Sequence, residues 1–182
     1  VEELPVLTRV VVAIDPAVTA HAKSDLCGIV VVGACTEGPP KDWRAYVIED
    51  ASVAGVSPSE WAEAALAARA RHHADRVVAE VNQGGELIAN VLRQIDPMVP
   101  YRAVRATRGK TVRAEPVAAL YEQGRVKHMP GLTALEEQMA LLSGQGFQGS
   151  GSPDRVDALV WALHELMIEP ASRWRDPRIR PL

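Results

Sequence analysis

Short apolar runs separated by polar turns predict five β-strands in the first 106 residues of the chain. The runs are rich in Val and Ile and are bounded by turn residues, which is typical of strands buried in a sheet. The first three are joined by links of 11 and 9 residues rich in Gly, Pro and Asp, a pattern that favours an antiparallel meander. The predicted strands are residues 7–14, 26–33, 43–49, 76–81 and 101–106.

The later segments carry helix signals. Ser57 followed by Pro58, with Glu60 three residues after the serine, predicts a capped helix start, and Ala-rich sequence continues the helix to about His73. Leading strands followed by alternating helices and strands predict an α/β fold, with a mixed central sheet and helices on both faces. Further helices are expected at 84–95, 111–123, 132–142 and 152–168, and a short extended piece at 125–128.

Two regions lack this periodicity. Residues 143–152 contain four glycines and are expected to form a flexible loop, after which Ser152 and Pro153 are expected to cap the last helix. The chain of 182 residues fits one medium domain. We therefore expect one domain over residues 1–169, followed by an irregular tail over residues 170–182.

Composition excludes several classes of protein. No stretch approaches the ~20 consecutive apolar residues of a membrane span, so no membrane partner is expected. The chain starts at Val1 without a signal-like segment, and we expect it to be a fragment or a processed product. Cys27 and Cys35 would lie ~26 Å apart on one strand, too far for a disulfide, which favours a reducing, cytoplasmic setting.

Acidic residues mark the ends of two predicted strands and the start of the last helix. Asp15 ends the first strand and Glu80 the fourth, while Asp154 and Asp157 share one face of the helix. If the two strands are neighbours, these carboxylates meet in one crevice. The alternative is structural: Asp15 could start a turn, and Asp154 could favour the positive helix terminus.

Clustered carboxylates repel one another, which costs stability unless cations occupy the site. Oxygen ligands suit hard divalent ions such as Mg²⁺ or Mn²⁺. Two such ions ~3.5–4 Å apart are a common device for hydrolysing a phosphodiester. The pattern therefore predicts two divalent metal ions held by Asp15, Glu80, Asp154 and Asp157, the four candidate catalytic residues.

Basic residues concentrate in another part of the chain, whose net charge is −3. Between Arg102 and Lys127 there are seven basic and two acidic residues, so this segment is +5 and the remainder is −8. A basic track beside an acidic pocket suits the phosphate backbone of DNA, although a solvated helix face gives the same pattern. The candidate DNA contacts are Arg108, Lys110, Arg113, Lys127 and Lys23.

One stretch in this segment partly matches a nucleotide-binding motif. Arg108 to Thr111 ends like a phosphate-binding loop, but Val104 stands where that pattern requires glycine, so ATP binding is not expected.

Four stretches in series resemble the C-terminal nuclease domain of the large terminase subunit, which packages DNA in tailed phages and gene transfer agents. They are residues 13–33, 77–85, 105–131 and 152–163. The resemblance implies an RNase H-like fold and a metal-dependent endonuclease that cuts concatemeric double-stranded DNA at the start and end of packaging. Asp15 and Glu80 match the family's strand carboxylates, and the Asp154–Asp157 stretch matches its terminal helix.

The resemblance also implies partners and a location. A full-length large terminase carries an N-terminal ATPase motor and works with a portal and a small terminase subunit, at the procapsid in the host cytoplasm. Two alternatives remain at this point. One is another RNase H-like nuclease of the resolvase or ribonuclease H type, and the other is a non-catalytic DNA-clamping or portal-docking module.

Overall fold

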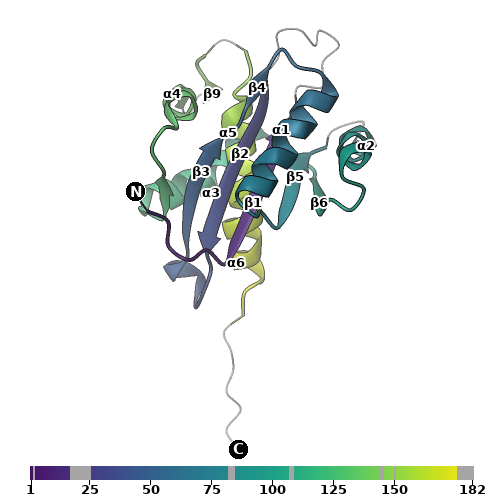
Figure 1. Ribbon diagram of the computed structural model, residues 1–182. Coiled ribbons are helices and arrows are strands. Elements are labelled where there is room, and N and C mark those ends of the chain that lie inside the picture. The colour runs from purple at the N-terminus through teal and green to yellow at the C-terminus, as the bar shows by residue number, and fades with distance from the viewer. Residues whose placement is uncertain are drawn as a thin grey trace, which may run out of the picture.

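The computed structural model describes residues 1, 3–16, 26–81, 85–106, 109–143, 146–149 and 151–175. A mixed sheet forms its centre (Figure 1), with strand order β6-β5-β1-β2-β3-β7 and the short β4 pairing with β2. The antiparallel meander β1–β2–β3 is present as predicted. The strands are β1 (Arg9–Asp15), β2 (Leu26–Cys35), β3 (Arg44–Asp50), β4 (Val53–Ala54), β5 (Arg76–Glu80), β6 (Tyr101–Val104) and β7 (Val126–His128).

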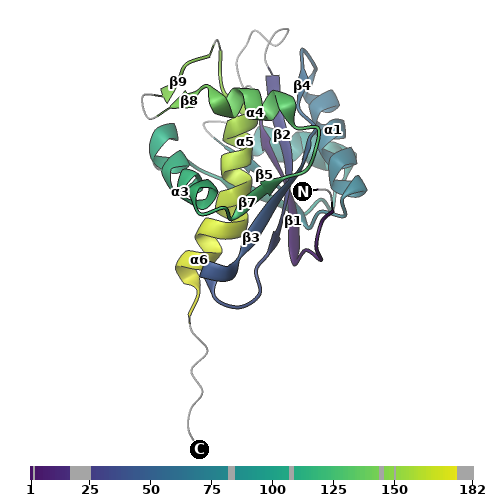
Figure 2. The same ribbon diagram turned by 90° about the vertical axis from the view of Figure 1, so that its left-hand side faces the viewer.

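Helices cover both faces of the sheet, as predicted (Figures 1 and 2). One face packs α1 and α2 against side chains such as Val12 and Ile29. The opposite face packs α3, α4 and α5 against side chains such as Val11 and Val30. Both faces are buried, which explains why β1 and β2 are continuous apolar runs. The helices are α1 (Pro58–Arg71), α2 (Gly85–Ile95), α3 (Lys110–Glu122), α4 (Thr133–Ala140) and α5 (Asp154–Leu163).

The start of α1 follows the sequence signal closely. The Ser57 hydroxyl accepts a hydrogen bond from the backbone N–H of Glu60, and the Ser57 N–H donates to the Glu60 carboxylate at 2.7 Å. This reciprocal pair satisfies two N–H groups that would otherwise lack partners at the helix start.

Two expectations for the C-terminal region are corrected. The glycine-rich segment is not a plain loop, because β8 (Leu142–Ser143) and β9 (Gly146–Phe147) pair as a small antiparallel hairpin. Gly146 has φ +104°, a conformation open mainly to glycine, and this permits the hairpin. The last helix begins after Pro153 without a side-chain cap, so Ser152 does not cap it.

Helical structure also extends beyond the expected end at 168. A π-helical turn (His164–Ile168) follows α5, and α6 (Glu169–Arg173) follows the turn. Among the described residues, no helix is long and apolar enough to cross a membrane.

Gly28 sets the distance between α5 and the sheet. It pairs with Asp15 across the β1–β2 ladder, and a Cβ atom at this position would lie 2.0 Å from the carbonyl oxygen of Asp154. Only glycine allows this approach, which brings the start of α5 beside the end of β1.

We therefore expect Gly28→Ala to lower the free energy of unfolding by about 2–4 kcal/mol, since backbone must move to admit the methyl group. Urea unfolding followed by circular dichroism measures this. Gly109→Ala is the matched control, because a Cβ there meets nothing within 4 Å. Equal stability of both variants and wild type would contradict the packing argument.

Candidate metal centre

Strand pairing brings the two strand carboxylates together. β1 and β5 are parallel neighbours, and the register that pairs Ile14 with Ala79 places Asp15 beside Glu80 at one edge of the sheet. The first turn of α5 adds Asp154 and Asp157. The structure therefore brings the four candidate acids into one region of the fold.

Three of the carboxylates form a close cluster. Asp15, Asp154 and Asp157 each offer one oxygen, and these oxygens all lie within 4.8 Å of one another. Asp154 and Asp157 are only 7% and 6% exposed. Converging, largely buried oxygen ligands fit a hard divalent cation, so the residues present are compatible with Mg²⁺ or Mn²⁺.

Crowding and burial favour the protonated forms of Asp15 and Asp157. Burial, reinforced by the charges of Asp157, Asp154 and Glu80, raises the pKa of Asp15 to about 8, although Lys110 opposes the shift. Burial also raises the pKa of Asp157, against the hydrogen bond and charge of Lys110. A bound cation would relieve this repulsion.

Lys110 supplies a positive charge from the first turn of α3. Its ammonium group donates a hydrogen bond to the Asp157 carboxylate and another to the Ser152 hydroxyl at 3.3 Å. Partial burial disfavours the charge, but the bond to Asp157 and the charges of the three aspartates outweigh it, so the pKa of Lys110 is raised. In this structure Lys110 is the counter-ion of the cluster.

Glu80 lies next to the cluster but has its own partners. Its Oε2 atom accepts a hydrogen bond from the Trp161 indole at 2.7 Å and lies 3.2 Å from the Arg113 guanidinium. Arg113 also stacks over the Trp161 ring, 4.5 Å from its centroid, and its carbonyl oxygen pairs with His164 at 2.9 Å. These contacts fix the Glu80 carboxylate in place.

Arg113 is incompletely satisfied. Its Nε and Nη1 atoms are buried without a hydrogen-bond partner among the described residues, so the pair with Glu80 is close but poorly aligned. The attraction between Arg113 and Glu80 is therefore mainly one of charge.

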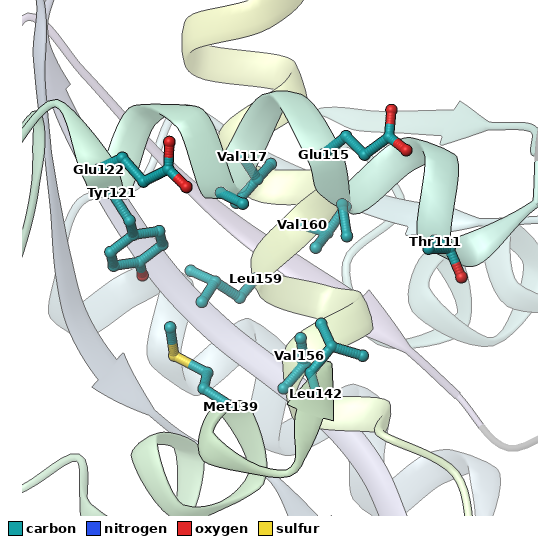
Figure 3. A pocket seen from close by; sticks show the side chains of 12 residues that line it. Thr111, Glu115, Val117, Tyr121, Glu122, Met139, Leu142, Val156, Leu159 and Val160 are labelled. Atoms are coloured by element: carbon teal, nitrogen blue, oxygen red, sulfur yellow. The ribbon is translucent and has the colours of Figure 1, made fainter. Parts of the chain in front are cut away.

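An apolar cavity lies away from these acids. A space of about 410 Å³ opens between α3, α4 and α5, with an apolar lining that includes Val117, Leu142 and Leu159 (Figure 3). None of the four clustered acids lines it. The carboxylate cluster, and not this cavity, carries the groups capable of chemistry.

Comparison with protein families decides what kind of domain this is. A family model for the terminase RNaseH-like domain matches residues 12–166, a span that contains all four acids. The chain belongs to this family. A search of curated protein sequences finds no match.

Solved structures agree with the terminase fold. The large terminase nuclease from the thermophilic phage G20c with bound magnesium superposes with a TM-score of 0.61 at 16% identity, covering 87% of this chain and 82% of that one. The cobalt-bound form gives a TM-score of 0.62 at 18% identity, covering 87% and 81%. The HK97 bacteriophage large terminase gives 0.58 at 13% identity, with 90% of this chain but only 41% of that one covered.

The terminase domain places the predicted DNA contacts in different surroundings. The expectation that Arg113 contacts DNA is corrected, because this residue is only 7% exposed and faces Glu80. It is therefore not on an open surface that could bind phosphates. Lys110 remains half-exposed but binds Asp157, so neutralising it would disturb the acidic site as well as any contact with DNA. Lys127 is exposed on β7, three strands and ~14 Å from β1. Arg108 and Lys23 lie outside the described residues.

Two residues of the site were missed from the sequence. Trp161 follows Asp157 by four residues and so lies on the same helix face, a spacing that could have revealed it. Gly28 interrupts an apolar strand, which is a signal for close approach of another backbone.

The pKa of Asp15 predicts a pH dependence in the metal-free domain. Because this pKa is raised above its unfolded value, the proton on Asp15 contributes stability at acidic pH that is lost as pH rises from about 4 towards 8. Metal must displace the proton, so affinity for Mg²⁺ should rise up to about tenfold per pH unit over the same range. Calorimetric titrations at pH 6 and 8 measure this, and Asp15→Asn should abolish the difference.

We expect Lys110→Met to have opposite effects with and without metal. Without metal, in EDTA, the melting temperature should fall, because Asp157 loses its counter-ion. In a separate titration without EDTA, the affinity of the site for Ca²⁺ should rise several-fold, because the Lys110 ammonium no longer competes with the metal. Thermal unfolding and calorimetry measure the two quantities. Lys127→Met, an equal charge change on exposed β7, should alter neither.

Proposed function

We propose that this domain is a metal-dependent endonuclease that cuts double-stranded DNA during packaging. The observation that carries the proposal is the convergence of Asp15, Asp154 and Asp157, whose carboxylate oxygens lie within 4.8 Å of one another in a domain of the terminase RNaseH-like family. Burying carboxylates that raise one another's pKa destabilises the folded domain, and the contact of Lys110 with Asp157 offsets that loss only in part. A bound metal ion would offset it, so a metal site explains why the acids lie together.

Asp15, Asp154 and Asp157 are the proposed metal ligands, and Glu80 completes the set. Bound Mg²⁺ or Mn²⁺, as a pair, would supply an activated water and charge stabilisation at the leaving oxygen. The bound magnesium in the phage G20c nuclease supports this choice of ion.

The chain's own residues prepare the site. Trp161 and Arg113 hold Glu80 through Oε2, so this carboxylate needs little reorganisation to act. Lys110 neutralises Asp157 in the metal-free domain and, being half-exposed, is free to leave it and contact a phosphate.

The packaging context extends the proposal. We infer that the substrate is concatemeric viral or gene-transfer-agent DNA and that the domain works with an ATPase motor, a portal and a small terminase subunit in the host cytoplasm. The terminase family match and the coverage of part of the HK97 large terminase support this context.

Plasmid nicking and linearisation test the activity. Supercoiled DNA incubated with Mg²⁺ or Mn²⁺ should be cut, and EDTA or Asp15→Asn should reduce the rate by at least about 10³-fold, since the site loses its charge or its metal. Asp42→Asn, an equal change at an exposed acid, is the control and should cut normally.

The outcome also separates the alternatives. Binding of duplex DNA without cleavage under any metal would favour a DNA-clamping module. Strong preference for a four-way junction or an RNA–DNA hybrid over plain duplex would favour a resolvase or ribonuclease H activity.

A further inference from the structure

A second charged cluster lies at the other end of the sheet, around Glu165 in the π-helical turn. Glu165 is 2% exposed, yet its carboxylate meets three guanidinium groups. Its Oε1 atom lies 3.0 Å from Arg9 and 3.5 Å from Arg76, and its Oε2 atom lies 2.5 Å from Arg102. We call Arg9, Arg76, Arg102 and Glu165 the Glu165 cluster.

The sheet presents these arginines side by side. They come from the neighbouring strands β1, β5 and β6, and all three point to the face that α5 covers. Arg9 and Arg76 open their strands, whereas Asp15 and Glu80 close them. The six-residue rise from Arg9 to Asp15 therefore separates the cluster from the metal centre by ~20 Å.

The cluster contains more positive charge than Glu165 requires. Arg102 also binds Glu169 at 2.6 Å, and Arg173 lies 3.5 Å from the same carboxylate, so Glu169 and Arg173 extend the Glu165 cluster. The four arginines in these contacts face two carboxylates, and Asp75, which accepts a hydrogen bond from the N–H of Val10, adds a third acid nearby. This group of side chains is thus +1 in a chain of net charge −3.

The arginines keep unused hydrogen-bond donors at the surface. The side chains of Arg9, Arg76 and Arg102 are 32%, 40% and 31% exposed. Within the described part of the chain, Arg76 meets Glu165 only at 3.5 Å and makes no shorter side-chain bond. Each guanidinium has five N–H groups in a planar fork, so most remain available for phosphate oxygens.

Stability alone does not explain such a cluster. A buried ion pair contributes little net stability compared with apolar residues of similar size. Glu165 instead acts as an anchor that fixes three guanidinium groups next to one another, so little entropy is lost when they bind an anion. The π-helical turn that carries Glu165 is a feature often found at functional sites.

We propose that the Glu165 cluster is a second DNA-contact site that binds phosphates of the duplex backbone. This inference rests on the proposed function in one respect: the proposed nuclease activity identifies DNA as the anionic ligand of the cluster. The ~20 Å to the metal centre corresponds to about six base pairs of duplex, short enough for one DNA molecule to reach both places. Contacts to backbone phosphates would position DNA without reading its sequence.

Salt-dependent binding tests the proposal. Fluorescence anisotropy of a labelled 20-base-pair duplex in EDTA, between 50 and 200 mM KCl, gives the slope of log K against log salt. Arg76→Gln should reduce the magnitude of the slope by about 0.9, and Arg76→Gln with Arg173→Gln by about 1.8, with Kd rising about five- to tenfold at the lower salt. Both variants leave Arg9 and Arg102 on Glu165.

Matched variants keep the result interpretable. Arg71→Gln removes the same charge from an exposed pair with Glu49 on the opposite side of the sheet and should leave the slope unchanged. Arg173→Gln alone touches only the surface carboxylate of Glu169, so it serves if Arg76→Gln fails to fold.

The outcomes separate this site from the proposed function. An unchanged slope in the variants, with wild-type binding intact, would overturn the second site and leave the nuclease proposal standing. Absence of DNA binding by wild type would overturn both. Binding of polyglutamate, a model of an acidic protein segment, can be measured in the same way. If wild type binds polyglutamate and the variants do not, while the variants bind DNA as wild type does, the assignment to DNA is overturned in favour of an acidic protein segment.

Discussion

Electrostatic repulsion among buried carboxylates is the constraint on which this domain is organised. Parallel pairing of β1 with β5 forces Asp15 and Glu80 together, and Gly28 lets α5 deliver Asp154 and Asp157 to the same point. The raised pKa of Asp15 is the direct consequence. The fold thus maintains an unfavourable arrangement of charge that a divalent cation would convert into a favourable one.

The continuous helix formed by α5 and the π-helical turn, which we call the helical rod, carries the side chains that respond to this repulsion. Acidic or hydrogen-bonding side chains recur along one side of α5 and the π-helical turn at spacings of three or four residues. Three of them, Asp157, Trp161 and Glu165, contact a lysine or arginine side chain. Lys110 faces Asp157, Arg113 stacks on Trp161, and three arginines surround Glu165. The rod therefore links the metal centre to the arginine-rich end of the sheet, with a polar seam inside an otherwise apolar interface.

Most of the fold was accessible from local patterns. The strands, the α1 capping box and the antiparallel meander followed from apolar runs and turn chemistry, because these signals reflect short-range energetics. The errors lay in the segment from 142 to 173, where a hairpin replaced a loop and helix continued through a π-helical turn. Glycine-rich sequence permits many conformations, so only tertiary packing selects one.

The sequence by itself determined which acids were candidates, since a carboxylate at a strand end or in an apolar helix face is recognisable without coordinates. The tertiary structure alone decided which groups touch them. Lys110 and Arg113 looked like one basic track, yet the fold directs one to Asp157 and buries the other against Glu80 and Trp161. The same holds for Glu165 and its three arginines, which lie 63 to 156 residues apart in the chain. Such pairings depend on strand order and helix placement, which no local pattern of residues encodes.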